Sequence, residues 1–527
     1  MPRIEFVLDR LRPLGWLAFA CWTVAAPTGI DAQSVSEMAA GEVVLTILHT
    51  NDLHGSVHYP GEAQGLAKIA TRVRQIRAEM PNVLLMDGGD IIHGTPAEKI
   101  YEGMPIIAAM NAAGYDVAVA GNHEFDFGQR IGQGAIAAAS FPMLSANVVD
   151  AASGESYGGL LPYMIREIEG VRVAIFGLTT DRTPEIQWPR TIAGIEFRDA
   201  IDAARSLVPR LRDEENADLV VALTHIGVEA DRELALAVPN IDVIVGGHSH
   251  TRLDEQVWVG ETLIVQTGSA ARALGRVDLV VQREENEGPS VAINGRDGRW
   301  WGHGGIAAPL GLEYPGQPLI PLSVDILDDP AVVAAYQPYN ERVQTYLDEE
   351  LTTALEPLAA EGAGVGEIPL GNLQADAVRD LTGADIGLSA LYSLNSAGLA
   401  AGPVSVRDVY ELFGGYTRQH LVVIRARGAT VRAALESANA DAVRLHVSGV
   451  RARADDYYVG EIPLHPDSSY TVASAAHILQ DYLIGRAGVT VVSDDPEAPT
   501  IRDATIEYLR DHPPLANIVE HRVTHEP

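Results

Sequence analysis

Residues 43–55 read VVLTILHTNDLHG, an apolar stretch that runs directly into the polar residues Asp52 and His54. The apolar and β-branched residues of this stretch predict a buried strand that ends at about His49. Open α/β sheets bind ligands beyond the carboxyl ends of their strands. We therefore expect Asp52 and His54 to lie at such an edge, where a ligand would bind.

Similar apolar stretches recur along the N-terminal half of the chain, and helical periodicity separates several of them. Leu66, Ile69, Val73 and Ile76 follow one another at helical spacing. Strands that alternate with helices predict a layered α/β core. The further short strands are predicted at residues 83–86, 117–120, 171–177, 219–224 and 243–245.

Residues of the kind that bind metal ions follow these predicted strands. In addition to Asp52 and His54, they are Asp90, Asn122, His225, His248 and His250. Taken singly, each has an ordinary structural explanation, such as a turn, a helix cap or a hydrogen-bonded buried histidine. Taken together, carboxylates, imidazoles and one amide suit Zn, Mn, Fe or Co better than Mg or Ca. The sequence therefore predicts two divalent ions that share Asp90 as a bridging carboxylate.

Four of these motifs also resemble those of a known family. Residues 49–55, 87–90, 121–126 and 247–250 are similar to the secreted 5′-nucleotidase/2′,3′-cyclic phosphodiesterase family of calcineurin-like metallophosphoesterases. The resemblance implies an α/β fold, with a four-layer αββα metallophosphoesterase domain at residues 43–283. It also implies a C-terminal α/β substrate-recognition domain of the 5′-nucleotidase type at residues 355–527.

Two segments are predicted between these domains. The composition changes at about residue 284, where glycine and proline become frequent, so an irregular connection is expected at residues 284–330. Residues 331–354 are expected to form a helix that leads the chain into the second domain.

The resemblance also implies roles for individual residues. One metal would be bound by Asp52, His54, Asp90 and His250, and the other by Asp90, Asn122, His225 and His248. The family pairs a histidine with an aspartate three residues later, here His123 and Asp126, as the catalytic pair. An imidazole oriented by a carboxylate stabilises transition-state charge or protonates the leaving oxygen. A metal-bound hydroxide would attack phosphorus in line with the leaving group.

The predicted substrate pocket departs from the family. Asn395 and Phe413 match residues that bind the nucleotide, but the two phosphate-binding arginines of the family are replaced by Gly366 and Ala400. Each lost arginine removes charge-assisted hydrogen bonds to phosphate. We therefore expect hydrolysis of nucleotides or related organic phosphates. One alternative is that the same metal chemistry hydrolyses a non-nucleotide ester. The other is that the chain is a binding protein with a diverged recognition domain.

The first 32 residues resemble an export signal. Three arginines precede an apolar run at residues 14–26, which is too short to span a bilayer. We expect a cleaved signal peptide and a periplasmic or secreted protein; the alternatives are lipid anchoring at Cys21 and a buried N-terminal helix. No later stretch is long and apolar enough to predict a membrane span. Cys21 is the only cysteine, so no intrachain disulfide can form.

Composition limits the partners. The chain has 527 residues with 38 Lys and Arg against 71 Asp and Glu, which gives a net charge of −33. Such a charge argues against nucleic acid as a partner, because phosphates are repelled. A phosphate ester faces the same repulsion, so its binding must depend on strong local positive charge, which two metal ions would supply. The sequence leaves the oligomeric state open.

Overall fold

The computed structural model of the chain describes residues 42–523, apart from residues 81, 285–286, 294–317, 361–366, 391–397, 414–419, 441–443, 454–455, 496–497, 513, 518–519 and 521. The predicted signal peptide at residues 1–32, with Cys21, lies outside the described residues, as do Gly366 and Asn395. Within the described ranges, no helix is both long enough and apolar enough to cross a membrane.

The first sheet is built around β1 (Glu42–Thr50), which pairs in parallel with β2 (Val83–Asp87) and antiparallel with β13 (Ala273–Glu284). Thr50 lies opposite Asp87, so the segments that follow β1 and β2 leave the sheet at the same edge. The strand order is β14-β13-β1-β2-β3-β4, and β15 also pairs with β13. The remaining strands are β3 (Val117–Val119), β4 (Met143–Leu144), β14 (Glu287–Ile293) and β15 (Leu319–Pro321).

The second sheet has the strand order β11-β12-β10-β9-β7-β6. Its inner strands β7, β9, β10 and β12 run parallel to one another, so their carboxyl ends also meet at one edge. The strands are β6 (Tyr163–Ile168), β7 (Val171–Thr179), β9 (Leu219–His225), β10 (Val243–Val245), β11 (Val257–Val259) and β12 (Thr262–Val265). A separate pair is formed by β5 (Val148–Asp150) and β8 (Ile195–Phe197).

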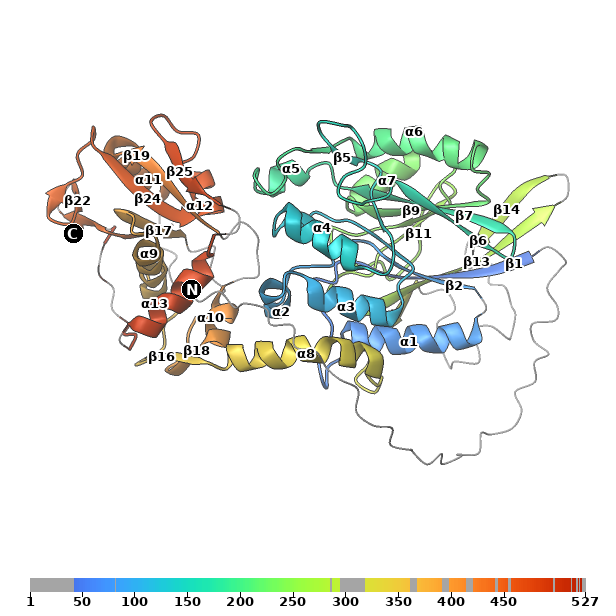
Figure 1. The fold of residues 1–527 in the computed structure, drawn as a ribbon, viewed down its shortest axis with the longest axis horizontal. Coiled ribbons are helices and arrows are strands. Elements are labelled where there is room, and N and C mark those ends of the chain that lie inside the picture. Colours follow the sequence, from blue (N-terminus) through green and yellow to red (C-terminus); the bar gives the residue numbers. More distant parts are fainter. Residues whose placement is uncertain are drawn as a thin grey trace, which may run out of the picture. The chain divides into compact units, whose positions relative to one another are not determined.

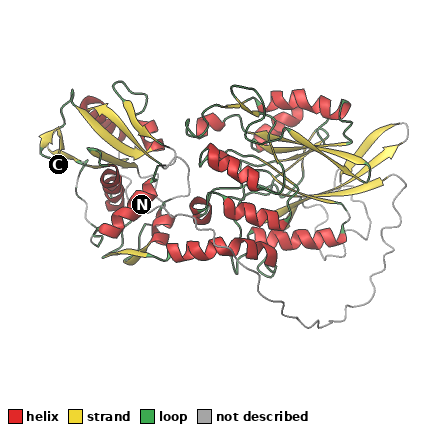
Figure 2. Cartoon of the chain, viewed as in Figure 1, coloured by secondary structure: helices red, strands yellow, loops and turns green. Residues whose placement is uncertain are grey.

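The alternation of apolar side chains along the strands produces four layers. Leu45 and Ile47 of β1 pack with Val221 and other residues of the second sheet in one buried cluster between the sheets. Leu48, on the other face of β1, packs with the helices on the outer side of the first sheet. Figures 1 and 2 show the helices on both outer faces, α1 and α3 on one side and α6 and α7 on the other. The predicted αββα arrangement is confirmed.

The helices of this domain vary in length. They are α1 (Leu66–Glu79), α2 (Pro96–Ile100), α3 (Met104–Ala113), α4 (Gln129–Ala138), α5 (Thr183–Ile186), α6 (Ala200–Asp213) and α7 (Val228–Ala237), with the 3-10 helix η1 (His123–Phe125). The periodic residues Leu66, Ile69, Val73 and Ile76 all face the core from α1, as the spacing predicts.

The irregular connection predicted at residues 284–330 is partly wrong. Strands β14 and β15 both lie within it and extend the first sheet. Val291 and Ile293 stand two residues apart, so they project to the same side and pack against the cluster between the sheets. The glycine and proline that precede them, at residues 288 and 289, obscured this alternation in the sequence.

The linking helix is also shorter than predicted. Helix α8 (Pro330–Leu347) begins where the Asp329 side chain accepts hydrogen bonds from the backbone N–H groups of Ala331 and Val332. Residues 350–354, expected to continue the helix, instead form strand β16 (Glu350–Ala354), which pairs with β18 (Gly402–Ser405). The adjacent β-branched residues Thr352 and Thr353 favour a strand over a helix.

The second α/β domain is built on a mixed sheet of order β20-β17-β24-β19-β25. Its helices and strands are α9 (Pro369–Thr382), β17 (Ile386–Ala390), α10 (Val406–Leu412), β19 (Leu421–Arg427), α11 (Gly428–Ala438), β20 (Leu445–Ser448), β21 (Val450–Arg453), β22 (Asp456–Val459), β23 (Ile462–Pro463), β24 (Ser469–Ala475), α12 (Ala476–Tyr482), β25 (Thr490–Asp494) and α13 (Ile501–Asp511). This domain confirms the predicted α/β class for the C-terminal part of the chain.

Candidate metal centre

The seven predicted metal ligands all lie just beyond, or at, the carboxyl ends of strands. Asp52 and His54 follow β1, Asp90 follows β2, Asn122 follows β3, His225 ends β9, and His248 and His250 follow β10. The first three of these strands pair in parallel, and so do the last two. The topology therefore carries residues that are up to 198 positions apart (250 − 52) to one place.

The structure brings six of these side chains into two groups. In the first group, ligand atoms of Asp52, His54 and His250 lie within 4.8 Å of one another. In the second, ligand atoms of Asp90, His225 and His248 do the same. These groups coincide with the two ligand sets that the resemblance implies, except for Asn122 and the sharing of Asp90.

The backbone around these ligands is unusual. Asp52, His54, Asp90, His248 and His250 all have positive φ, between 47° and 77°. Residues other than glycine seldom adopt this region, and its cost persists only where the surrounding structure holds it. Close packing contributes, because a Cβ at Gly121 would lie 2.2 Å from Oδ1 of Asp90. Five strained ligands at one edge indicate a site whose geometry is fixed before a ligand binds.

The donor set fits divalent transition-metal ions. Asp52 and Asp90 are 0% and 1% exposed, and among the described residues only histidines form ion pairs with them. Buried carboxylates require a compensating charge. Oδ1 of Asn122 is also buried and has no hydrogen-bond partner in the described part of the chain, so it remains available as a ligand. Four imidazoles, two carboxylates and this amide suit Zn, Mn, Fe or Co.

The predicted catalytic pair is formed beside this centre. Nδ1 of His123 lies 2.5 Å from Oδ2 of Asp126, and Nε2 lies 3.8 Å from Oδ2 of Asp90. Burial favours the neutral ring, but the carboxylates of Asp126 and Asp90 outweigh it and raise the pKa of His123 to about 10. The imidazole therefore carries a proton at neutral pH in the metal-free protein, and Nε2 is the end that faces the metal ligands.

The loops that carry these residues are joined by one buried carboxylate. Glu124, which is 2% exposed, accepts hydrogen bonds from the backbone N–H groups of Asp90, Ile91 and Gly121. Its two oxygens thus hold the loop after β2 against the loop after β3. The backbone N–H of His123 also donates to Oδ1 of Asp90 at 2.9 Å, so the two contacts together fix Asp90 and His123 relative to each other.

Comparison with known proteins agrees with this geometry. Residues 45–252 match the family model of calcineurin-like phosphoesterases, and residues 349–483 match that of the 5′-nucleotidase C-terminal domain. The chain thus combines a region similar to calcineurin-like phosphoesterases with a region similar to the 5′-nucleotidase C-terminal domain.

Individual known proteins are similar to the chain over parts of their length. The chain is 40% identical to a 5′-nucleotidase of Vibrio cholerae over 223 residues, which are 39% of this chain and 40% of the relative. It is 31% identical to the 5′-nucleotidase of Homo sapiens over 365 residues, 64% of this chain and 60% of the relative. It therefore spans less than two-thirds of either relative. A putative 5′-nucleotidase from Staphylococcus aureus has the same fold, with a TM-score of 0.68 at 19% identity, over 92% of this chain and 99% of that chain.

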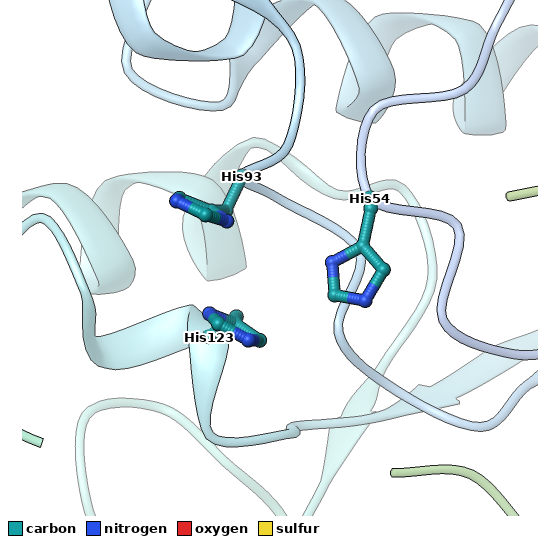
Figure 3. Close-up of side chains that lie close together, drawn as sticks. All are labelled: His54, His93 and His123. Atoms are coloured by element: carbon teal, nitrogen blue, oxygen red, sulfur yellow. The ribbon is translucent and has the colours of Figure 1, made fainter. Parts of the chain in front are cut away.

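Two residues at the metallophosphoesterase site were not predicted. His93 lies three positions after Asp90 and its ring stacks on that of His123 (Figure 3). Gln187 follows α5 and donates hydrogen bonds to Oδ1 of Asp126 and to the carbonyl of Asn122. The nearness of His93 to Asp90 in the sequence was a usable signal. Gln187 has no comparable signal, because it is 61 residues from Asp126.

The predicted nucleotide pocket of the 5′-nucleotidase C-terminal domain is only partly described. Asn395 and Gly366 lie outside the described residues, and Ala400 is exposed. Phe413 is 2% exposed, and the guanidinium of Arg502 lies 5.9 Å from its ring centre. Arg502 also lies 4.5 Å from the ring of Tyr410. Substrate contacts for Asn395 and Phe413 stay predictions.

Proposed function

We propose that the protein is an exported, dinuclear metal-dependent phosphoesterase that hydrolyses nucleotides or related organic phosphates. The observation that supports this most directly is the pair of ligand groups at one sheet edge, with His123 beside Asp90. When bound, two divalent ions would make water a stronger nucleophile and offset the charge of the phosphoryl oxygens. The positive charge of the two ions would compensate, at the site, for the net negative charge of the chain.

The chain's own contribution is the placing of one proton. Asp126 accepts a hydrogen bond from Nδ1–H of His123, and this bond fixes which edge of the ring faces the metal ligands. In the metal-free protein the raised pKa of His123 keeps a proton on Nε2, the position from which a protonated ring can stabilise transition-state charge or protonate the leaving oxygen. The side chain of Asp126 is 2% exposed, which keeps water from competing for its contact with Nδ1 of His123.

The proposed substrate class follows from the relatives, both of which are named 5′-nucleotidases. A second candidate is an ester without a nucleobase. It is favoured by the burial of Phe413, since a ring that is 2% exposed presents no open face to a base. It is also favoured by Ala400, an exposed residue with no charge to bind phosphate, where the family has arginine.

We propose a periplasmic or secreted location from the leader-like first 32 residues, with lipid attachment at Cys21 as the alternative. The mass and N-terminal sequence of the protein recovered from cell fractions distinguish cleavage from acylation.

The experiment for the proposed activity is hydrolysis of nucleoside mono-, di- and cyclic phosphates and of aryl phosphates, with added Mn²⁺ or Co²⁺. We expect activity in the wild type, none in Asp90→Asn or Asn122→Ala, and wild-type activity in Asp380→Asn, which alters an exposed carboxylate on α9. Hydrolysis of aryl phosphates alone would support the second candidate. Full activity of a metal-loaded Asp90→Asn variant would contradict the mechanism, and an inactive wild type with both metals bound would favour a binding protein.

A further inference from the structure

His93 forms a stacked pair with His123. The ring centres are 4.8 Å apart and the ring planes differ by 6°, and Figure 3 shows the two rings lying one above the other. His93 is 3% exposed. Its Nε2 has no hydrogen-bond partner among the described residues and lies 3.8 Å from Oδ2 of Asp126. Its Nε2 therefore lies near Asp126 without a hydrogen bond to it, and the contact between the two rings is the closer link to His123.

The stacked arrangement argues against a third metal ion. Ring nitrogens of His54, His93 and His123 lie within 4.8 Å of one another, which by distance alone would allow an ion. The lone pair of an imidazole nitrogen lies in the plane of its ring, so an ion must lie close to the plane of each ring that binds it. Two parallel stacked rings have no such common position. His54 also belongs to the Asp52 group.

The stack supplies a constraint that the Asp126 hydrogen bond lacks. The bond from Nδ1 of His123 to Asp126 fixes one edge of the ring, but it leaves the ring free to rotate about that contact. Such a rotation moves Nε2, the atom that faces Asp90. Contact between two flat ring faces opposes it. Productive catalytic geometry tolerates errors of only about 0.5 Å and 10–20°.

On the basis of the proposed function, we propose that His93 is a positioning residue that holds the ring plane of His123 for catalysis. His93 also packs against Phe127, with 5.8 Å between ring centres and 43° between the ring planes. The His93 ring is therefore in contact with a second aromatic ring besides that of His123.

The backbone of His93 supports this role independently. Its φ is +82°, in the same sparsely populated half of conformational space as the ligands Asp52, His54 and Asp90. Strain of this kind concentrates at functional sites. The next residue, Gly94, has φ +113°, and a Cβ there would lie 2.5 Å from the carbonyl oxygen of His54. The turn that carries His93 is thus packed directly against the turn that carries a metal ligand.

The test compares three substitutions of His93 on the full chain loaded with Mn²⁺, using p-nitrophenyl phosphate and one nucleoside monophosphate. His93→Phe keeps a flat ring without nitrogen atoms, His93→Gln keeps polarity without a ring, and His93→Ala keeps neither. We expect His93→Phe to retain at least a third of kcat. We expect His93→Ala and His93→Gln to lower kcat by about 10- to 100-fold, with KM within twofold and metal content unchanged. His465→Ala, an exposed histidine in the second domain, is the control.

A role through His123 also requires a specific interaction between the two substitutions. In a His123→Ala background, His93→Ala should lower the residual kcat no further. The proposal is overturned if His93→Phe is as inactive as His93→Ala, because the nitrogen atoms would then matter. It is equally overturned if the fall in kcat of the double variant equals the product of the falls in the two single variants.

A second measurement does not depend on activity. The imidazole proton shared by His123 and Asp126 should give a downfield NMR signal that remains in His93→Phe and broadens or disappears in the folded His93→Ala and His93→Gln variants. An unchanged signal in both of the latter overturns the proposal even if the wild type hydrolyses no ester. If the wild type is inactive but the signal behaves as expected, the proposed activity fails while the positioning role stands.

Discussion

Gln187 connects Asp126 of the predicted catalytic pair to Asn122, a predicted metal ligand. Its side-chain amide lies 2.5 Å from Oδ1 of Asp126 and 3.0 Å from the carbonyl oxygen of Asn122, and it donates to both. The residue is 3% exposed, so these bonds are shielded from water. A single amide thus sets the position of the carboxylate that orients His123 relative to the segment that carries Asn122.

Substitution of Gln187 should therefore reduce turnover while leaving substrate binding unchanged. A hydrogen bond to a charged group contributes about 1.5–3 kcal/mol, and each 1.4 kcal/mol is a factor of ten in rate. We expect Gln187→Ala to lower kcat by about 10- to 100-fold. We expect Gln187→Glu to be worse, because a carboxylate cannot donate to Asp126. Steady-state kinetics with Gln133→Ala as the control measure this; a change in KM alone would contradict it.

Asp126→Asn should shift the pH dependence of turnover in a defined direction. Asp126 raises the pKa of His123, which is about 10 in the metal-free protein. Removing this carboxylate lowers the pKa, so the protonated ring is lost at a lower pH. The alkaline limb of the kcat profile should therefore move toward neutral pH, together with a fall in the maximum. An alkaline limb at the wild-type position would show that another group controls it.

Metal binding should stabilise the protein and chelation should reverse the effect. An ion that binds only the folded state stabilises it by about 2.7 kcal/mol at 100 times its Kd. Addition of Mn²⁺ to the chelated protein should raise Tm by several degrees, measured by scanning calorimetry. Asp90→Asn removes the ligand predicted to be shared, so most of this rise should vanish. The same rise in Asp90→Asn and the wild type would contradict a bridging role for Asp90.

The clustering of the predicted metal ligands could be foreseen because each motif stands at the end of a strand. Asp52, Asp90 and His225 follow short apolar stretches that are readable in the sequence, and strand order alone brings them together. Gln187 could not be predicted, because its contact with Asp126 depends on how the segment after α5 folds back. His93 could have been noticed by its distance from Asp90, but the stack on His123 depends on backbone conformations that sequence spacing does not show.

The layers of the fold could also be predicted from local sequence patterns, whereas features that depend on strand pairing could not. The layers follow from alternating apolar residues such as Leu45, Ile47 and Leu48, which assign each strand face to one layer. The errors occurred where local composition disagrees with strand pairing. Strand β14 contains a glycine and a proline yet pairs with the neighbouring strand β13, and β16 follows closely on a long helix yet pairs with the distant strand β18.

Glu98 should make the stability of the protein depend on pH. The residue is 0% exposed, and a Cβ at Gly55 would lie 2.3 Å from its Cγ, so it packs under the turn that carries His54. Burial raises its pKa to about 8, although a hydrogen bond from the backbone N–H of Ile106 opposes the rise. The unfolded value is about 4.3. The folded state therefore binds the extra proton between these values, and stability is lost as the pH rises from about 4.3 through 8.

Glu98→Gln keeps the shape of the protonated side chain but cannot ionise. The variant should match the wild type at pH 5 and exceed it in free energy of unfolding at pH 9, since each pKa unit corresponds to about 1.4 kcal/mol. Urea denaturation of metal-free protein at both pH values measures the difference. Asp380→Asn, an exposed carboxylate, should follow the wild type. If Glu98→Gln lost as much stability as the wild type between pH 5 and 9, ionisation of Glu98 would not be the cause of the loss. Other buried acids would then have to account for it, such as Asp87, whose pKa is raised by burial to about 7.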